Sequence, residues 1–426
     1  MNCIPSSRIR RLLLLGALCA ACNAQVSEPP PDPLTYRVDY ELRPDRSDGS
    51  VDVTLRIVQP RALLRELRMR PDGRVRDVGG DGKIDVGADG ITWNPPARGG
   101  VMTWSADVAH RRNGDGYDAW LGTDWGLFRA EDVIPRAATR TLKGARSETW
   151  LTVHVPADWS VVTEYYDDDG KHRIDDPDRR FDQPNGWIVV GELGVRRETI
   201  AGVRVAIAGP AHQGIRRMDT LALLSWTLPE LARILPQMPR RLTVFSAGEP
   251  MWRGGLSAPQ SLFIHAGRPL ISENATSTLL HEVMHIVLDF EAAAGNDWIV
   301  EGLAEYYSLQ LLHRSGTLSQ RRYEEARRDL ALWADDADAL CAPTSRGATT
   351  ALAVSVLDAL NREIIDATSG EADLDDLVVA LLQHDGALDL QSFTSLAAEI
   401  IGTKPDALHI DKLPGCRNIV PATESH

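Results

Sequence analysis

Residues 281–307 read HEVMHIVLDFEAAAGNDWIVEGLAEYY, and this stretch decides how the rest of the chain is interpreted. Two histidines, His281 and His285, lie four residues apart, and Glu282 follows the first of them. Apolar residues recur around them at helical spacing, which predicts a helix. Residues i and i+4 share one face of a helix, so the two imidazoles can bind a single cation, and imidazole suits zinc.

A second predicted helix follows across the turn AAAGND, and it carries Glu301 and Glu305. A catalytic zinc site takes three protein ligands, and Glu301 is the candidate for the third because two helices joined by a short loop pack side by side. Glu282 would then act as the general base on the metal-bound water. Glu305 either hydrogen-bonds the free nitrogen of a ligand histidine or faces solvent.

The alternative interpretation of the same stretch is an ordinary amphipathic helix, capped by Asn274 or Ser277, with histidines in its core. The pattern HExxH is short and recurs by chance. Here the motif lies on a predicted helix and an acidic residue follows at helix-pair distance, which favours the metal site.

The motif HEVMH…WIVEGLAEYY resembles the HExxH…WxxEGxAxY signature of the gluzincin metallopeptidases, the M1 and M61 aminopeptidase families. Further stretches resemble other parts of these families: MWRGGLSAP at 251–259 their substrate-binding strand, residues 344–382 their C-terminal helices, and YRVDYELRP at 36–44 the N-terminal domain of M61, whose layout is closest. The resemblance implies an α+β protein with an N-terminal antiparallel, sandwich-like β domain, a thermolysin-like zinc catalytic domain and a helical C-terminal region.

The substrate-binding strand implied by the resemblance comprises Gly254, Gly255, Leu256 and Ser257. These families carry a glutamate where Ser257 stands, and that glutamate binds the free amine of the substrate. A hydroxyl cannot form an ion pair with an ammonium group, so a standard aminopeptidase specificity is not expected.

A second departure concerns the tyrosine that these families place before a Lys-Gly pair, where its hydroxyl stabilises the tetrahedral intermediate. Thr344 occupies that position, before Arg346-Gly347, and its side chain is too short to take the same role. The loss of one such donor typically lowers the rate by about 10²–10³-fold. The residues that we consider as replacements are Tyr306, Tyr307, Tyr323 and His265.

The N-terminus has the features of an export signal. Arginines precede the apolar run LLLLGALCAAC, and residues 1–24 are interpreted as a signal peptide followed by a tether at 25–35. Cys22 after two alanines predicts a bacterial lipoprotein, periplasmic or anchored in the outer membrane, and cleavage after Ala24 is the alternative. In an oxidising compartment Cys341 and Cys416 either form a disulfide or remain as two buried thiols.

Hydrophobic periodicity divides the mature chain into a β-rich region at 36–212, a catalytic region at 213–315 and a helical region at 316–426. The net charge of −14 argues against non-specific binding to nucleic acid. No later apolar run reaches the ~20 residues that a membrane-spanning helix needs, so we expect membrane contact only through a lipid on Cys22.

The sequence therefore predicts an exported zinc metallopeptidase that acts on a peptide or protein substrate, in an oligomeric state that the sequence leaves open. Two alternatives are a metal-retaining pseudopeptidase that binds a peptide or partner in the cell envelope, and a zinc hydrolase of another substrate. The intact Glu282 favours catalysis because a binding module needs no general base beside its metal ligands.

Overall fold

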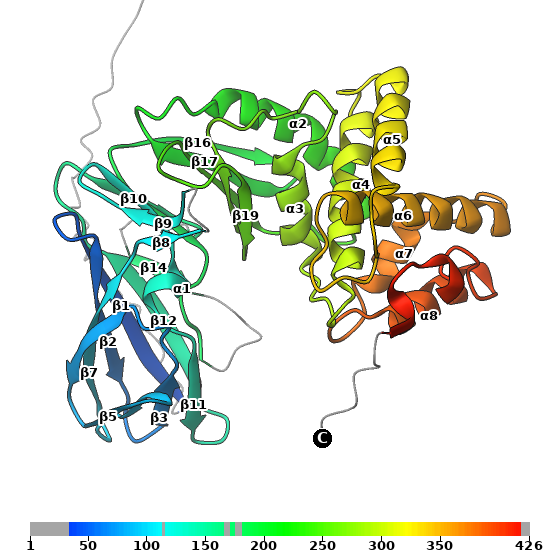
Figure 1. Ribbon diagram of the computed structural model, residues 1–426. Helices are drawn as coiled ribbons and strands as arrows, with labels where there is room; N and C mark the ends of the chain where they lie inside the picture. Colours follow the sequence, from blue (N-terminus) through cyan, green and yellow to red (C-terminus); the bar gives the residue numbers. More distant parts are fainter. Residues whose placement is uncertain (1–33, 113–115, 166–170, 175–180, 419–426) are drawn as a thin grey trace, which may run out of the picture. The chain divides into compact units, whose positions relative to one another are not determined.

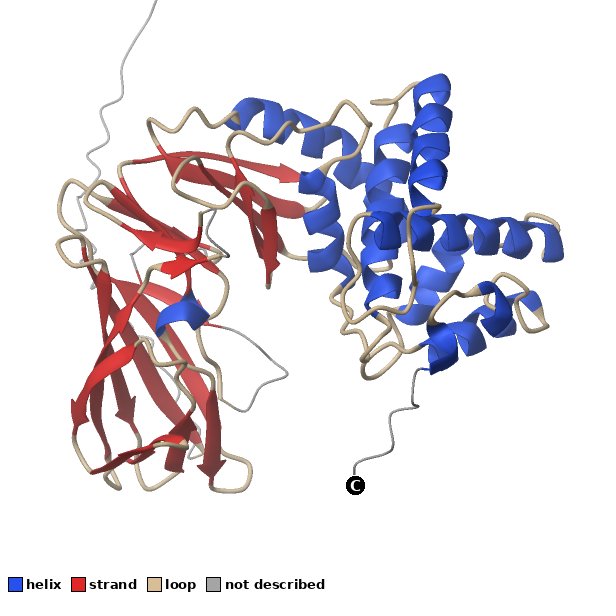
Figure 2. Ribbon diagram, in the orientation of Figure 1, coloured by secondary structure: helices blue, strands red, loops and turns tan. Residues whose placement is uncertain are grey.

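The computed structural model describes residues 34–112, 116–165, 171–174 and 181–418. The predicted signal peptide, Cys22 and all but the end of the predicted tether lie outside these residues. The described chain is rich in strands in its first half and rich in helices in its second half, as the periodicity of the sequence predicts (Figure 2).

Three sheets form the first half of the described chain. One has six strands in the order β14 (Lys171–Ile174), β12 (Arg146–Val153), β1 (Thr35–Asp45), β2 (Ser50–Val58), β7 (Gly99–Asp107) and β4 (Val75–Gly80). A second has four, in the order β11 (Ala137–Thr141), β3 (Leu64–Met69), β6 (Gly90–Asn94) and β5 (Lys83–Gly87). The third has five: β13 (Ser160–Thr163), β15 (Trp187–Gly191), β10 (Trp125–Arg129), β9 (Tyr117–Leu121) and β8 (His110–Arg111); the short helix α1 (Ala130–Val133) follows β10.

The six-stranded and four-stranded sheets pack against a common hydrophobic core. Alternate residues of β1 are buried, among them Tyr36 and Tyr40, because successive side chains of a strand point to opposite faces. They share one hydrophobic core with Leu67 of β3 and Trp93 of β6. The prediction that this region is antiparallel is wrong for one pair, since β1 and β12 run parallel, and the long segment between them supplies the crossover that parallel pairing requires.

A fourth sheet, of five strands, supports the catalytic region. Its order is β16 (Leu193–Ile200), β17 (Val203–Pro210), β18 (Arg241–Ala247), β20 (Ser261–His265) and β19 (Gly255–Ala258). β16 and β17 lie before the predicted boundary at 212/213, yet the structure places them with the catalytic strands because β17 pairs in parallel with β18. β19 pairs with β20 only, so it is an edge strand of this sheet.

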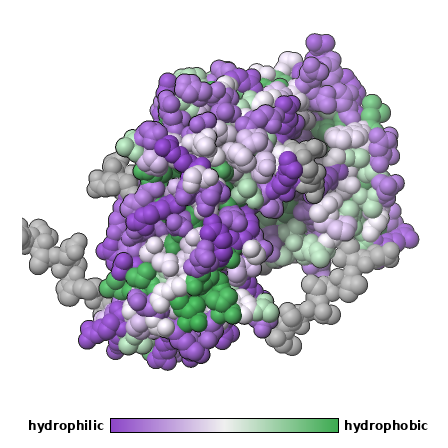
Figure 3. Space-filling view, turned by 60° about the vertical axis from the view of Figure 1, so that its left-hand side comes forward, coloured by the Kyte–Doolittle hydropathy of each residue, from purple (hydrophilic) through white to green (hydrophobic). Residues whose placement is uncertain are grey.

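Seven longer helices of the described residues follow the strand β17 or connect the strands after it (Figure 1). They are α2 (Arg217–Ile234), α3 (Thr278–Leu288), α4 (Asp297–Arg314), α5 (Gln320–Ala334), α6 (Ala348–Ala367), α7 (Leu374–Leu381) and α8 (Leu390–Ile401), and two 3-10 turns follow at Ile410–Lys412 and Cys416–Asn418. No helix of the described residues is both long and apolar enough to cross a membrane. Figure 3 shows hydrophilic side chains over most of the viewed face, with hydrophobic areas between them.

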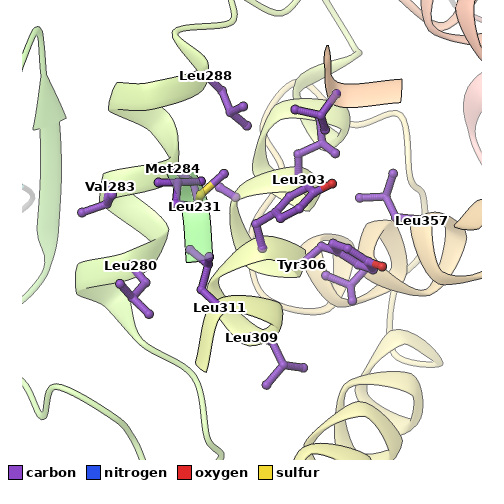
Figure 4. Close-up of a cluster of buried hydrophobic side chains, with 14 of the residues drawn as sticks. Leu231, Leu280, Val283, Met284, Leu288, Leu303, Tyr306, Leu309, Leu311 and Leu357 are labelled. Atoms are coloured by element: carbon purple, nitrogen blue, oxygen red, sulfur yellow. The ribbon is translucent and has the colours of Figure 1, made fainter. Parts of the chain in front are cut away.

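The core of the helical half holds α3 and α4 side by side (Figure 4). Met284 of α3, Leu303 of α4, Leu231 of α2 and Leu357 of α6 belong to one buried cluster. Full burial of a side chain of this size stabilises the fold by about 1.5–3 kcal/mol. This packing fixes the two helices that carry the predicted metal ligands.

Cys341 and Cys416 form a disulfide with a Cα–Cα distance of 4.9 Å. Cys341 lies in the segment between α5 and α6, and Cys416 lies near the end of the described chain. A backbone hydrogen bond from Leu340 to Pro414 runs beside it at 2.8 Å. The C-terminal segment is thus attached to the loop that precedes α6.

Candidate active site

The helix α3 directs His281 and His285 toward α4 and Glu282 toward β19, because the apolar face of the helix packs into the hydrophobic core. The Ser277 side chain caps the helix by accepting a hydrogen bond from the Leu280 N–H at 3.3 Å, which selects Ser277 over the other candidate cap. The apolar face packs inward through Leu279, Leu280, Val283, Met284 and Leu288. The Nε2 atoms of His281 and His285 lie 3.1 Å apart.

The helix α4 brings two glutamates to these histidines. Glu301 Oε2 lies 3.2 Å from His281 Nε2, and its Oε1 lies 3.5 Å from His285 Nε2. Glu305 Oε2 lies 3.1 Å from His281 Nδ1. One ligand atom from each of His281, His285 and Glu301 lies within 4.8 Å of the other two. The structure therefore brings the three predicted ligands together and places Glu305 against the first histidine, rather than in solvent.

Burial and charge perturb the ionisation of this group. Burial by itself lowers the pKa of His281, but hydrogen bonds to Glu301 and Glu305 outweigh it and raise the pKa to about 10. Burial, with the charge on His281, lowers the pKa of His285 to about 4. Burial raises the pKa of Glu301, yet the two histidines outweigh this effect and the net pKa is lowered.

Glu282 lies between α3 and the edge strand β19. Its side chain is 9% exposed, and it accepts hydrogen bonds from the backbone and hydroxyl of Ser257. Burial raises its pKa, against the opposing charge of His281 and the Ser257 hydrogen bonds. A Cβ at Gly255 would lie 2.8 Å from Glu282 Cγ and 2.8 Å from Thr278 Cγ2, so only glycine lets the strand approach the helix this closely.

His281, Glu282, Glu301 and Glu305 line a cavity of about 780 Å³. Its walls come from the segment 252–255, from the loop between β20 and α3, from α3, α4 and α5, and from the segment that leads into α6. The lining includes Gly254, Gly255, His281, Glu282, Glu301, Glu305, Trp252, Arg268, Asp329, Trp333, Ser345 and Arg346. A space of this size is typical of a ligand-binding site.

Two residues of the predicted substrate-binding strand do not line the cavity directly. The Leu256 carbonyl accepts a hydrogen bond from Trp187 Nε1 at 3.2 Å, and the side chain packs against the core between the sheets. Ser257 acts on the site through its hydrogen bonds to Glu282. Thr344 is exposed and lies outside the cavity, whereas its neighbours Ser345 and Arg346 line it.

Among the described residues that line the cavity there is no tyrosine. The Tyr307 hydroxyl donates to Asp375 at 2.8 Å, and the Tyr323 hydroxyl accepts from Gln310 at 2.6 Å. Tyr306 is buried in the helical core. None of the three tyrosines that we considered as replacements therefore stands at the site.

His265, the fourth candidate replacement, lies on the wrong face of the sheet. Alternate side chains of a strand point to opposite faces, so His265 shares a face with Phe263. Phe263 packs into the cluster with Trp187 of the N-terminal half, while its neighbour Ile264 packs against the helices. Burial lowers the pKa of His265, and the residue is not part of the cavity lining.

Sequence reasoning did not single out Trp252, Arg268, Asp329 and Trp333, which also line the cavity. They lie on loops and on an exposed helix face, where no periodicity or motif marks them. Arg346 was noted only as the equivalent of a lysine in the resembled families. Its position in the cavity follows from packing between elements that are distant in sequence.

No protein-family model matches this chain, and no curated protein matches it. Solved structures do match it. An aminopeptidase N family protein from Idiomarina loihiensis has 15% sequence identity and a TM-score of 0.65, over 84% of this chain and 75% of that one. Yeast LTA4 hydrolase in complex with bestatin has 13% identity and a TM-score of 0.54, over 89% and 67%. Native yeast LTA4 hydrolase has 14% identity and a TM-score of 0.52, over 88% and 65%.

The described chain therefore has the fold of these aminopeptidase N-type and LTA4 hydrolase structures. This agrees with the M1 side of the predicted resemblance as far as the fold is concerned. The closer likeness in layout to M61 stays a prediction.

Proposed function

We propose that this protein is a zinc-dependent peptidase in which His281, His285 and Glu301 hold the metal and Glu282 is the general base. The observation that carries the proposal is the convergence of the three ligand atoms within 4.8 Å, beside a cavity that His281, Glu301 and Glu282 line. Two imidazoles and one carboxylate are a donor set that catalytic zinc sites use.

The surrounding residues fit a zinc ion as well. Glu305 accepts a hydrogen bond at His281 Nδ1, which orients the ring and leaves Nε2 for the metal. Zinc bound here would lower the pKa of a coordinated water to about 7 and polarise a peptide carbonyl. The fold shared with an aminopeptidase N family protein supports the same function.

Proton transfer is the task of Glu282 in this proposal. The carboxylate takes a proton from the attacking water and returns it to the leaving amine. The hydrogen bonds from Ser257 hold the carboxylate in position. β19 is an edge strand of its sheet, so an extended peptide can pair with those of its backbone groups that Trp187 and Glu282 do not already bind.

We expect internal peptide bonds, rather than bonds next to a free amine, to be the substrates. Ser257 cannot pair with an ammonium group, and beyond the three glutamates of the site the described lining offers only the carboxylate of Asp329. A buried charge without a partner is strongly disfavoured. Acetylated peptides should be cleaved at least as well as the same peptides with a free amine, and glycyl or alanyl anilides should be poor substrates.

Export is part of the proposal, with a peptide or protein of the cell envelope as the substrate and zinc as the cofactor. It rests on the signal-like N-terminus and on Cys22 as the lipid-bearing residue. Replacement of Cys22 by serine should move the protein from the membrane fraction to the soluble periplasm. A wild-type protein that already fractionates as soluble would favour cleavage after Ala24 instead.

A second candidate function is a pseudopeptidase that retains the metal and binds a peptide or partner. The observation in its favour is that no tyrosine lines the cavity among the described residues. The two functions differ in turnover, since both require the metal ligands but only catalysis requires Glu282.

The deciding experiment uses the purified mature protein, reloaded with zinc, and a peptide library analysed by mass spectrometry. Elemental analysis should give about one zinc per chain, and the content should fall in His285→Ala. Cleavage by the wild type that disappears in Glu282→Gln supports the peptidase. Peptide binding without cleavage supports the pseudopeptidase, and a protein that binds no zinc contradicts both.

A further inference from the structure

Two arginines line the cavity without a carboxylate partner among the described residues. The Arg268 guanidinium donates to the Thr278 hydroxyl at 2.9 Å, which is a neutral acceptor. Arg346 forms no ion pair or side-chain hydrogen bond within the described part of the chain. By contrast Arg253, a third arginine of the cavity, pairs with Glu249 at 2.8 Å. These two guanidinium groups thus have no paired carboxylate among the described residues, although the same lining also holds the carboxylates of Glu282, Glu301, Glu305 and Asp329.

The backbone that carries Arg346 is held in place. The neighbouring Ser345 N–H donates to Asp297 at 2.7 Å, at the start of α4. The Arg346 carbonyl accepts from the Thr349 N–H at 3.1 Å, and Gly347 adopts a φ of +56° that favours glycine. The disulfide at Cys341 fastens the same loop. A ligand would therefore need to order only the exposed side chain of Arg346.

The charge of the cavity differs from that expected for binding a free amine. Ser257 contributes no negative charge, and Glu301 and Glu305 are engaged with His281. The remaining carboxylates of the lining are those of Glu282, the proposed general base, and Asp329. Arg346 acts on the same region, because its charge reaches Glu301. An arginine presents a fixed fork of N–H donors that matches a carboxylate, so the free guanidinium selects for that group.

We propose that the cavity recognises substrates through a carboxylate, bound by Arg346 with Arg268 as the supporting cation. The inference rests on the proposed function and names its substrate class: peptides that carry an acidic side chain, or their own C-terminal carboxylate, close to the scissile bond. The two sources present the same chemistry to the arginines.

Three peptides test the proposal, and they differ only in the residue next to the cleaved bond and in the C-terminal group. The first has a glutamate next to the cleaved bond and an amidated C-terminus, the second has glutamine and a free C-terminus, and the third has glutamine and an amide. We expect kcat/KM for the first or the second to exceed that for the third by roughly tenfold or more, the range of a charge-assisted hydrogen bond. The better of the two identifies the source of the carboxylate.

Variants assign the preference to Arg346. Arg346→Gln should reduce it to within about twofold, and Arg346→Lys should retain part of it, because the charge remains while the paired geometry is lost. Arg253→Gln is the matched control: it removes an arginine that already has a partner, so the preference should stay. A preference that survives Arg346→Gln would mean that the carboxylate binds elsewhere, for example at the metal, and would overturn the proposal.

Binding separates this inference from the proposed catalysis. Calorimetry with the zinc-loaded Glu282→Gln protein measures the Kd of each peptide without turnover. Tighter binding of a carboxylate peptide, lost in Glu282→Gln combined with Arg346→Gln, supports the inference even if the wild type cleaves nothing. Equal cleavage and equal binding of the three peptides, or no binding of any, overturns it while leaving the zinc and cleavage tests to judge the peptidase.

Discussion

Replacement of Gly255 by alanine tests how the fold positions the general base. The added Cβ would lie 2.8 Å from Glu282 Cγ, 2.8 Å from Thr278 Cγ2 and 3.0 Å from Glu282 Oε1. The φ of Gly255 is one that alanine adopts readily, so backbone strain does not enter. Since the Cβ meets two side chains one helical turn apart, a rotamer change at Glu282 alone cannot relieve the overlap.

The geometry sets the size of the effect. Ordinary van der Waals contact begins at 3.4 Å, so the strand and the helix side chains must separate by about 0.6 Å. A misplacement of about 1 Å can lower the rate by about 10²-fold, and we therefore expect kcat to fall by roughly ten- to a hundredfold. Zinc content should stay near the wild-type value, because His281 and His285 do not contact the new methyl group directly.

The assay is zinc-dependent peptide cleavage, with kcat and KM measured separately and zinc counted by elemental analysis. Gly255→Val should lower kcat further, since the larger side chain overlaps more. Gly87→Ala is a matched control, because a Cβ there would meet nothing within 4 Å and its φ is ordinary. Thermal unfolding of each variant excludes a general loss of folding.

A Gly255→Ala protein with kcat within twofold of the wild type would refute the packing argument, provided that Glu282→Gln is inactive. Loss of zinc from Gly255→Ala would refute it in another way. It would show that β19 supports the metal ligands of α3 rather than the general base.

Three further predictions concern the metal site and the disulfide. Glu305→Gln should weaken zinc binding by about 10–100-fold in a chelator competition, because it removes the carboxylate that orients His281; an unchanged affinity would contradict this role. The pKa of His281 is raised from 6.5 to about 10, so without metal its proton stabilises the fold fully below pH 6.5 and this contribution is lost as the pH rises toward 10. Zinc must displace that proton, so the zinc affinity should rise with pH across this window. Calorimetry in buffers of different ionisation enthalpy should detect the released proton, and zinc binding without proton release would contradict the prediction. Replacing both Cys341 and Cys416 by serine should lower the free energy of unfolding by about 4 kcal/mol, since the bridge closes a loop with a sequence separation of 75; a loss below about 1 kcal/mol in urea unfolding would show that the bridge constrains little.

Much of the candidate site was predictable because its information is local. His281 and His285 stand one turn apart on a helix whose apolar face is visible in the sequence, and the next helix follows after a short turn. Local geometry then leaves little freedom in where Glu301 can lie, and the structure places it 3.2 Å from His281 Nε2. The start of the first helix was predictable in the same way, since Ser277, one of the two candidate caps, caps α3.

The errors and omissions arise where pairing joins distant segments. The boundary at 212/213 separated β17 from β18, because strand periodicity does not reveal which strands become neighbours. The sequence does not show which face of its strand His265 occupies, and the packing of the neighbouring side chains decides it. Trp252, Arg268 and Trp333 carry no local signal at all, since they become cavity residues only through the assembly of several elements.

By itself the sequence determined the pair of helices and the histidines and glutamates that these helices bring together, because side-chain periodicity and short loops act over a few residues. The tertiary structure alone decided that Gly255 of the edge strand presses against Glu282, that no tyrosine of the described chain lines the cavity, and that Arg346 does. It also decided that Cys341 meets Cys416. Each of these depends on contacts between residues far apart along the chain, and such contacts are selected by the burial of the whole core rather than by any local pattern.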